Sequence, residues 1–278
     1  MTASIAQTSS TGINVERAYD YRSRNANSDP LRKKIAVALG YKPSDFTGAA
    51  ADANIGEGCG NPLLIANLKE GDFVVDLGSG GGFDCFLASK QVGPAGKVVG
   101  FDMTENMVKL ARRNGSKLGL SNVEFVHANI NKLPLPDNSV DCVMSNCVLN
   151  LVPDDEKLAV VGEIHRILKP CGRLAISDFL ALKPMPSEIK DDPALRSGCV
   201  SGAVEVDRMK QLLFDIGFDD ILLVDTKKDL NLYKENETSK SVTPCCAGGG
   251  SCEPAALTAS GRKELDYDLN EYICKRIT

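Results

Sequence analysis

Tryptophan is absent from this sequence of 278 residues, and histidine occurs only twice, as His127 and His165. Both histidines stand in apolar-patterned segments, so we interpret them as structural rather than as bases or metal ligands. No run of about 18 apolar residues is present, so no membrane-spanning helix is expected. The polar first residues also lack the apolar core of a signal peptide, which favours a cytoplasmic protein.

The sequence also lacks an excess of basic residues: 32 lysines and arginines stand against 37 acidic residues, for a net charge of −5. Without a basic surface, nucleic acid is a poor candidate partner, and a small molecule is favoured. Cysteine, by contrast, is abundant, with ten copies. None belongs to a C-x-x-C pair of the zinc type. Because cytosolic thiols stay reduced, these cysteines are expected to have a role other than forming structural disulfides.

A glycine-rich turn follows an apolar run at residues 73–77. In FVVDLGSGGG the run predicts a strand, and Gly78 and Gly80 allow a sharp turn that a ligand can approach closely. The next apolar run ends in Asp102, about 20 residues further on, where a carboxylate can bind both ribose hydroxyls. Phe83 stands where a dinucleotide fingerprint has its third glycine. The pattern therefore predicts a nucleotide-like ligand other than NAD.

Apolar runs of β type alternate with helical periods from residue 71 to residue 226. We expect strands at residues 73–77, 97–101, 123–127, 140–145, 172–177 and 221–225, and helices at residues 83–92, 104–118, 154–168 and 207–216. Such alternation predicts an α/β fold with a mostly parallel sheet and helices on both faces. Because ligands bind at the carboxyl ends of such strands, Asn129 and Asn146 should share one crevice with Gly78 and Asp102.

The segments outside this alternation differ in composition. We expect helices at residues 14–25 and 30–39, the second capped by Asp29, a loop at residues 48–61, and a polar, glycine-rich segment at residues 227–254. Residues 261–278 are compatible with a helix or a strand. The predicted parts are N-terminal helices with the Cys59 loop at 1–70, a cofactor-binding core at 71–182, and a C-terminal region with a cysteine-rich tail at 183–278.

Five segments carry a family resemblance: GCGNP around Cys59, DLGSGGGFDCF, GFDMTENM, SNCVLNLVPD and SGCVSGAV. They resemble segments of the arsenite methyltransferases, which transfer methyl groups from S-adenosylmethionine to trivalent arsenic. The match spans about Val15 to Lys228. The glycine motif alone indicates a class I methyltransferase with a Rossmann-like sheet, and the cysteine segments narrow the resemblance to arsenic. An enzyme of arsenic detoxification with S-adenosylmethionine as cofactor is implied.

The resemblance also implies roles for individual residues. Cys59, Cys147 and Cys199 would bind arsenic, a thiophilic centre of the kind that soft thiolates select. The implied cofactor residues are Asp76, Gly78, Ser79 and Gly80 at the methionine end, Asp102 at the ribose, Met103 on the adenine, Asn129 and Ile130 at the adenine edge, and Asn146 near the amino-acid end. Three thiolates leave arsenic a lone pair for the sulfonium methyl group, so the enzyme mainly holds two reactants in line.

Two other functions stay open at this point. Another small-molecule methyltransferase could share the cofactor half, and a non-catalytic metalloid-binding protein could use the same thiols. Arsenite or its glutathione complex is the expected substrate, with glutathione or thioredoxin as reductant. Family members usually carry a further cysteine before the position of Cys59, and this sequence has none. Either the reductant acts differently here, or a tail cysteine forms the disulfide with Cys59.

The remaining cysteines are interpreted case by case. Cys142 and Cys171 are expected to be structural, because buried free cysteine behaves as a small hydrophobe. Cys85 follows the glycine turn, where a helix N-terminus lowers a thiol pKa, yet packing beside the cofactor is favoured. Cys245, Cys246 and Cys252 lie in the tail, where the vicinal pair Cys245 and Cys246 either collects arsenite and passes it inward or belongs to a disordered or adventitiously metal-binding segment.

Overall fold

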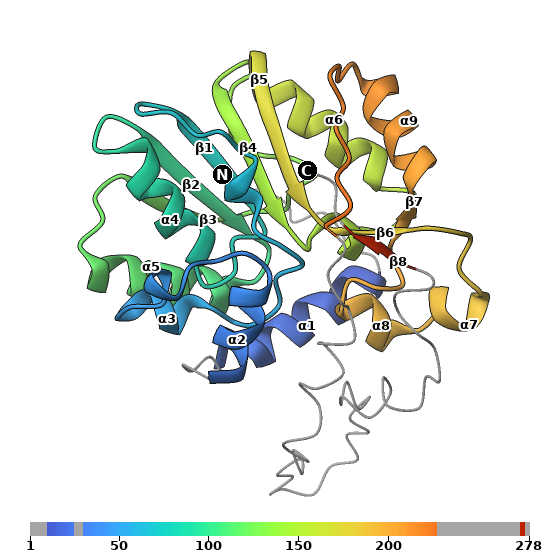
Figure 1. Cartoon of the computed structure of the whole chain (residues 1–278), viewed down its shortest axis with the longest axis horizontal. Coiled ribbons are helices and arrows are strands. Elements are labelled where there is room, and N and C mark those ends of the chain that lie inside the picture. Colours follow the sequence, from blue (N-terminus) through green and yellow to red (C-terminus); the bar gives the residue numbers. More distant parts are fainter. Residues whose placement is uncertain (1–9, 25–29, 227–272, 276–278) are drawn as a thin grey trace, which may run out of the picture.

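Five parallel strands form the central sheet of this computed structural model, which describes residues 10–24, 30–226 and 273–275 (Figure 1). In sheet order they are β3 (Val123–His127), β2 (Lys97–Asp102), β1 (Phe73–Leu77), β4 (Val140–Asn146) and β5 (Leu168–Ser177). Every neighbouring pair in the sheet is parallel. The chain builds outward from β1 in both directions, so the order reverses between β1 and β4, where such sheets bind ligands.

Helices cover both faces of the sheet, as the alternating pattern predicts (Figure 1). They are α4 (Phe83–Val92), α5 (Glu105–Leu118), α6 (Lys157–Ile167) and α9 (Val206–Ile216). Along β1, Val74 packs toward α4 and α5, whereas its neighbour Val75 packs toward α6 and α9. Each buried valine or leucine contributes about 1.5–3 kcal/mol relative to exposure. The two apolar layers therefore hold the sheet between its helices, and the positions of the strand ends follow from this packing.

Short elements precede the central sheet in the chain, and the α-helices among them lie near the carboxyl ends of the strands (Figure 1). They are α1 (Ser10–Arg24), α2 (Pro30–Ala38), η1 (Pro43–Asp45), α3 (Ala49–Ala53) and η2 (Pro62–Leu64). The loop predicted at residues 48–61 is wrong in its first part, where α3 forms. Alanine is the strongest helix former, and Ala50 and Ala53 are buried in the core beside α4. Cys59 still lies in an irregular stretch.

A second, smaller sheet adjoins the end of β5, in the order β7-β6-β8. Its strands are β6 (Phe179–Ala181), β7 (Val204–Glu205) and β8 (Ile273–Lys275). Two short helices, α7 (Ser187–Lys190) and α8 (Pro193–Ser197), stand between β6 and β7 in the chain, and η3 (Leu149–Leu151) follows β4. The strand predicted at residues 221–225 is wrong, since only Leu223 makes a bridge. Ile221 and Leu223 pack against the core, so the period-two pattern there reflects side-chain packing without a partner strand.

Other boundaries shift by a few residues. Helix α6 begins at Lys157 instead of residue 154, and β5 begins at Leu168 instead of residue 172. Cys171 therefore falls inside the strand and is exposed, so the expectation of a buried structural thiol there is wrong. In the described part of the chain, no helix combines the length and the apolar character needed to cross a bilayer. The expected cap and the tail cysteines lie outside the described residues: Asp29, Cys245, Cys246 and Cys252.

Candidate functional site

A cavity of about 280 Å³ opens at the carboxyl ends of β1, β2 and β4. All nine residues predicted to contact the cofactor line it: Asp76, Gly78, Ser79, Gly80, Asp102, Met103, Asn129, Ile130 and Asn146. Cys147 lines the cavity as well, and neither His127 nor His165 does. The crevice expected at the strand ends is therefore present, and the individual roles of its residues remain predictions.

The glycine turn after β1 leaves room for a ligand because of its backbone geometry. Gly78 has a φ of 68°, and a Cβ atom there would lie 2.4 Å from the side chain of Val148, so a larger residue does not fit. Asp102 fastens the turn, because its carboxylate accepts the backbone N–H of Gly80 at 2.9 Å and that of Thr104 at 2.8 Å. Each carboxylate oxygen keeps a second lone pair for a ribose hydroxyl.

Two buried carboxylates, Asp76 and Asp84, face the same cavity. Burial, and after it the charge of Asp84, raises the pKa of Asp76, and burial also raises the pKa of Asp84. The Cys85 thiol donates to Asp76 at 3.1 Å, and burial raises its pKa, so Cys85 is a packed thiol and not an activated one. No described lysine or arginine pairs with either carboxylate. Such a pair favours a ligand that brings positive charge.

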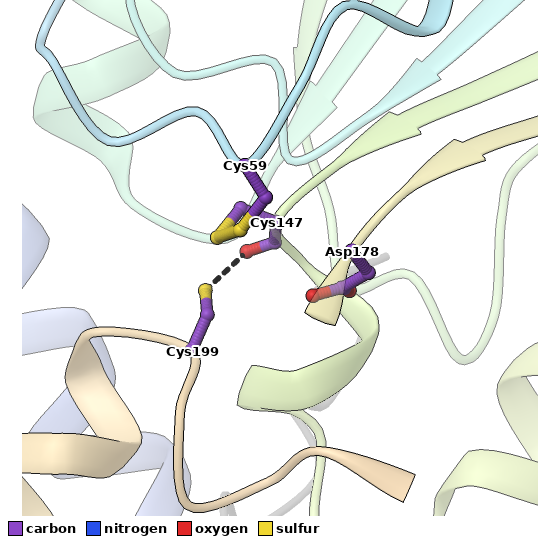
Figure 2. A group of neighbouring side chains, drawn as sticks. All are labelled: Cys59, Cys147, Asp178 and Cys199. Carbon is purple, nitrogen blue, oxygen red and sulfur yellow. Dashed lines mark hydrogen bonds between the residues drawn. A yellow bond between two sulfur atoms is a disulfide. The ribbon is translucent and has the colours of Figure 1, made fainter. Parts of the chain in front are cut away.

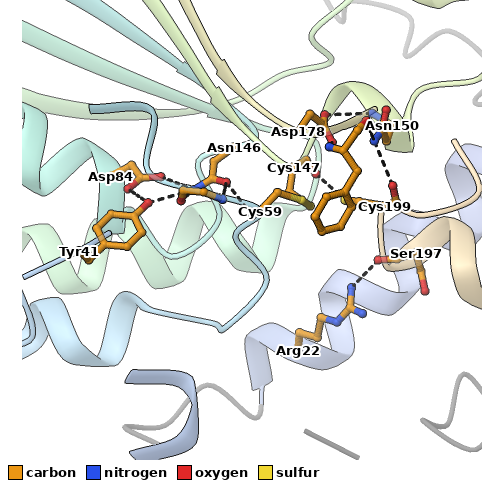
Figure 3. Close-up of a disulfide and its surroundings, with 12 residues drawn as sticks. Arg22, Tyr41, Cys59, Asp84, Asn146, Cys147, Asn150, Asp178, Ser197 and Cys199 are labelled. Carbon is orange, nitrogen blue, oxygen red and sulfur yellow. Dashed lines mark hydrogen bonds between the residues drawn. A yellow bond between two sulfur atoms is a disulfide. The ribbon is translucent and has the colours of Figure 1, made fainter. Parts of the chain in front are cut away.

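Asn146, the last residue of β4, joins this cavity to the loop that carries Cys59 (Figure 3). Its Oδ1 accepts the backbone N–H groups of Cys59 at 2.9 Å and Gly60 at 3.2 Å. Its Nδ2 lies 3.0 Å from both Asp84 Oδ2 and the Tyr41 hydroxyl. The Tyr41 hydroxyl in turn donates to Asp84 at 2.6 Å. One buried network thus positions the Cys59 loop relative to the two carboxylates.

Three cysteines from distant parts of the chain converge beside the cavity (Figure 2). Cys59 lies in the loop between α3 and η2, Cys147 follows β4, and Cys199 follows α8. Their sulfur atoms and a carboxylate oxygen of Asp178 all lie within 4.8 Å of one another, and all four residues are buried. The Cys199 thiol donates to the backbone carbonyl of Cys147 at 2.8 Å. The fold therefore gathers the three cysteines that the resemblance implies as arsenic ligands.

Two of these cysteines are covalently joined, because Cys59 and Cys147 form a disulfide across 88 residues of sequence (Figure 2). Their Cα atoms lie 5.2 Å apart, within the usual range for disulfides. The resemblance implies thiolates at Cys59 and Cys147, and one of the two alternatives for an oxidised Cys59 is a disulfide with a tail cysteine; here the partner is Cys147. The physical reason is that Asn146 holds the Cys59 loop against the end of β4. In this form, Cys199 is the cysteine of the group that lies outside the disulfide.

The backbone at Cys147 and Cys199 is left-handed, with a φ of 64° at each. For residues other than glycine, such a conformation costs on the order of 1–3 kcal/mol and persists where the surroundings enforce it. Hydrogen bonds enforce it here: the Cys147 N–H donates to the carbonyl of Ser177 at 2.8 Å, and the Cys199 N–H donates to that of Arg196 at 2.9 Å. Cys171, which lies apart from the three gathered sulfur atoms, has a φ of 63° as well, so the left-handed backbone alone does not mark a functional cysteine.

A buried polar pair, Asp178 and Asn150, lies behind the sulfur atoms (Figure 3). Asp178 accepts the backbone N–H groups of Phe179 at 3.0 Å and Asn150 at 3.2 Å, and burial raises its pKa to about 7. The Asn150 side chain donates to the carbonyls of Phe179 at 2.8 Å and Cys199 at 3.0 Å. The Cys199 loop is thereby held against the start of β6.

Arg22 of helix α1 contacts the loops that carry Cys59 and Cys199. Its guanidinium lies 3.1 Å from the carboxylate of Glu57 and donates to the carbonyl of Ser197 at 3.3 Å. Glu57 stands two residues before Cys59, and Ser197 stands two residues before Cys199. Arg22 therefore links, with one side chain, the two loops that carry Cys59 and Cys199.

Comparisons with known proteins agree with this geometry. A family model described as a methyltransferase domain matches residues 68–236. An arsenite methyltransferase of Halobacterium salinarum is 41% identical over 229 residues, which cover 78% of this chain and 58% of that protein. The human arsenite methyltransferase is 39% identical over 170 residues, covering 58% of this chain and 44% of that protein. The chain thus spans about half the length of the curated relatives it matches.

One solved structure extends the comparison to three dimensions. The arsenic(III) S-adenosylmethionine methyltransferase from Chlamydomonas reinhardtii is 31% identical, with a TM-score of 0.55, and the match covers 74% of this chain and 69% of that one. This chain belongs to the arsenite methyltransferase family. The resemblance and the class I methyltransferase fold predicted from the sequence are both confirmed by these matches.

Within this family framework, sequence reasoning missed several residues of the site. Asp178 directly follows β5, so the strand-end rule that indicated Asn129 and Asn146 would have found it. Asp84 lies in the first turn of α4, just after the glycine turn. Tyr41 and Arg22 had no sequence signal, because only the packing of the N-terminal elements brings them to the site.

Proposed function

We propose that this chain transfers methyl groups from S-adenosylmethionine to trivalent arsenic bound by Cys59, Cys147 and Cys199, as a step of arsenic detoxification in the cytosol. The observation that carries the proposal is the convergence of the three sulfur atoms within 4.8 Å, beside a cavity that Cys147 also lines. Membership of the arsenite methyltransferase family supports it. In this proposal residues 71–182 bind the cofactor, residues 1–70 contribute Cys59, and residues 183–278 contribute Cys199.

In this reaction the protein has to position the two reactants and does not have to supply an acid or a base. Soft thiolates bind arsenic well, and three of them leave its lone pair available. S-adenosylmethionine, when bound, supplies a methyl group on a positively charged sulfur. The task of the chain is to aim one group at the other, and such alignment corresponds to effective concentrations of about 10⁵–10⁸ M. Asn146 and Arg22 hold the Cys59 loop, and Asn150 holds Cys199.

The polar groups of the cavity fit this cofactor. Asp102 has lone pairs for the ribose hydroxyls, and Asp76 and Asp84 offer negative charge to the ammonium and sulfonium groups. The Ser79 hydroxyl is buried, and no described residue forms a hydrogen bond with it. Ser79 also lines the cavity, and we assign it to the methionine end, as the resemblance implies. Met103 lines the cavity next to Asp102, in a place suited to packing on the adenine.

A thiol reductant completes the proposal, because the disulfide between Cys59 and Cys147 occupies two of the three ligands. Two reductant thiols give up two electrons and two protons and become one disulfide, while Cys59 and Cys147 become free thiols. We propose glutathione or thioredoxin in this role. Glutathione can also present arsenite as a thiol complex, whose thiols then exchange with those of the protein.

Cofactor binding is expected to become tighter as pH rises through the acid range and to release protons. Burial raises the pKa of Asp76 and Asp84, so the free protein keeps protons on this pair above the usual pKa of aspartate. The cationic cofactor favours the ionised pair, so the affinity rises with pH until the pair is ionised in the free protein, and then levels off. Titration calorimetry in buffers of different ionisation enthalpy measures the protons released. Asp84→Asn should release fewer, and a pH-independent affinity would contradict the prediction.

The proposal is tested by incubating reduced protein with S-adenosylmethionine, arsenite and glutathione and separating the products by chromatography coupled to mass spectrometry. We expect methylated arsenic and an equal amount of S-adenosylhomocysteine. Cofactor binding without methylated arsenic would refute the arsenic substrate and leave a methyltransferase with another acceptor. Arsenite binding without consumption of the cofactor would instead indicate a metalloid-binding protein.

A further inference from the structure

Arg32 presents an unpaired buried nitrogen at the wall of the cofactor cavity. The cavity-lining residues of the α2 segment are Arg32, Ile35, Ala36 and Leu39, which follow the spacing of one helix face. Three of them are apolar, so the arginine is the exception on this face. Its Nη1 is buried, and no described residue forms a hydrogen bond with it. A buried guanidinium nitrogen without a partner is costly unless a ligand completes it.

The charge around the cavity makes this arginine distinctive. Among the lining residues that the structure describes, the carboxylates are Glu57, Asp76, Asp84, Asp102 and Glu156, and Arg32 is the one cation. Glu57 already pairs with Arg22 at 3.1 Å. The cavity therefore offers several negative groups and a single positive group. A matching ligand carries positive charge together with one anionic group.

Local packing holds Arg32 close to the glycine turn after β1. The Asn54 side chain donates to the backbone carbonyl of Arg32 at 3.3 Å. A Cβ atom on Gly56 would lie 2.7 Å from Cγ of Arg32, so the absence of a side chain there makes room for the arginine stem. Between them, Ile55 reaches to 3.4 Å from the place of a Cβ on Gly80. The segment from Asn54 to Gly56 thus contacts both Arg32 and the glycine turn, and all three line the same cavity.

We propose that Arg32 binds the carboxylate of the methionine moiety of the cofactor. S-adenosylmethionine has one carboxylate and two cationic centres, the ammonium and the sulfonium, which matches the single cation and the several acids of the cavity. A guanidinium meets a carboxylate through two parallel hydrogen bonds, a geometry that an ammonium cannot reproduce. The proposal concerns the cofactor alone, and it stands or falls independently of the arsenic chemistry.

The test compares two ligands that differ only in the carboxylate, S-adenosylmethionine and its decarboxylated form, by titration calorimetry. Arg32→Met keeps the length of the stem and removes the charge. We expect it to weaken binding of S-adenosylmethionine about 10- to 100-fold, the range for a lost hydrogen bond to a charged group. Binding of the decarboxylated ligand should stay within about twofold of wild type. Arg32→Lys should recover part of the affinity for S-adenosylmethionine only.

The controls separate a carboxylate contact from a general effect on the cavity. Lys34→Met removes an exposed positive charge from the same helix and should change neither affinity. The thermal unfolding midpoint of each variant reports whether the fold is retained, and Arg32→Lys serves if Arg32→Met unfolds. An equal loss for both ligands, or no loss for either, would overturn the proposal.

Discussion

Replacing Cys199 with serine is expected to reduce kcat/KM for arsenite methylation on the order of 100-fold or more. Serine keeps the shape of cysteine but offers arsenic a hard oxygen in place of the soft sulfur that it prefers. Removing a residue that merely supports a metal ligand already costs about 10- to 100-fold, so the loss of a direct ligand should cost at least as much. Initial rates at saturating S-adenosylmethionine, with arsenite varied, measure the effect.

Two controls make this result specific to arsenic binding. Cys171 is exposed and stands apart from the three gathered sulfur atoms, so Cys171→Ser should keep wild-type activity. Cys199 does not line the cofactor cavity, so Cys199→Ser should bind S-adenosylmethionine as tightly as wild type. Undiminished methylation by Cys199→Ser would mean that two thiolates suffice. A parallel loss of cofactor affinity would contradict the separate arsenic site.

The sheet and its crevice were predictable because their signals are local. Strand β1 is an apolar run interrupted only by Asp76, the turn after it requires glycine at Gly78, and Asp102 closes the next run. Helix α3 was not predictable in the same way. Five residues are too few to form a helix from propensity alone, so α3 depends on burying Ala50 and Ala53 against the core. The strand expected near Leu223 fails for another reason: its apolar residues pack against the core, and among the described residues its pairing stops at a single bridge.

The three candidate arsenic ligands were implied by the resemblance, but their pairing was not. The resemblance implied Cys59, Cys147 and Cys199 together, yet nothing in their spacing indicated which two would pair. That pairing follows from Asn146, which bonds to the backbone of Cys59 from the residue before Cys147. The contacts of Arg22 with Glu57 and Ser197 depend in the same way on where α1 packs. Contacts of this kind join segments far apart in sequence, so only the folded chain reveals them.

Arsenite binding is expected to depend strictly on prior reduction of the disulfide between Cys59 and Cys147. A disulfide sulfur has no thiol proton to lose and is no thiolate ligand, so the oxidised group offers only Cys199. After reduction, As(OH)₃ and three thiols give a tris-thiolate and three waters. The dissociation constant for arsenite should therefore be at least about 100-fold lower in the reduced protein, again on the scale of lost ligands. Arsenic retained after gel filtration, counted by mass spectrometry, measures it.

The design must keep other thiols from masking this difference. Reduction by a phosphine, followed by its removal, avoids dithiols that bind arsenite themselves. Replacing Cys245, Cys246 and Cys252 with serine gives a background without the tail thiols. In that background Cys59→Ser is the decisive variant, because it removes the disulfide partner of Cys147 and leaves the group with at most two thiols, Cys147 and Cys199. It should bind arsenite weakly whether or not a reductant was used. Full binding by oxidised protein with Cys59 in place would contradict the proposed ligand set, and peptide mapping of the same sample identifies the cysteine joined to Cys59.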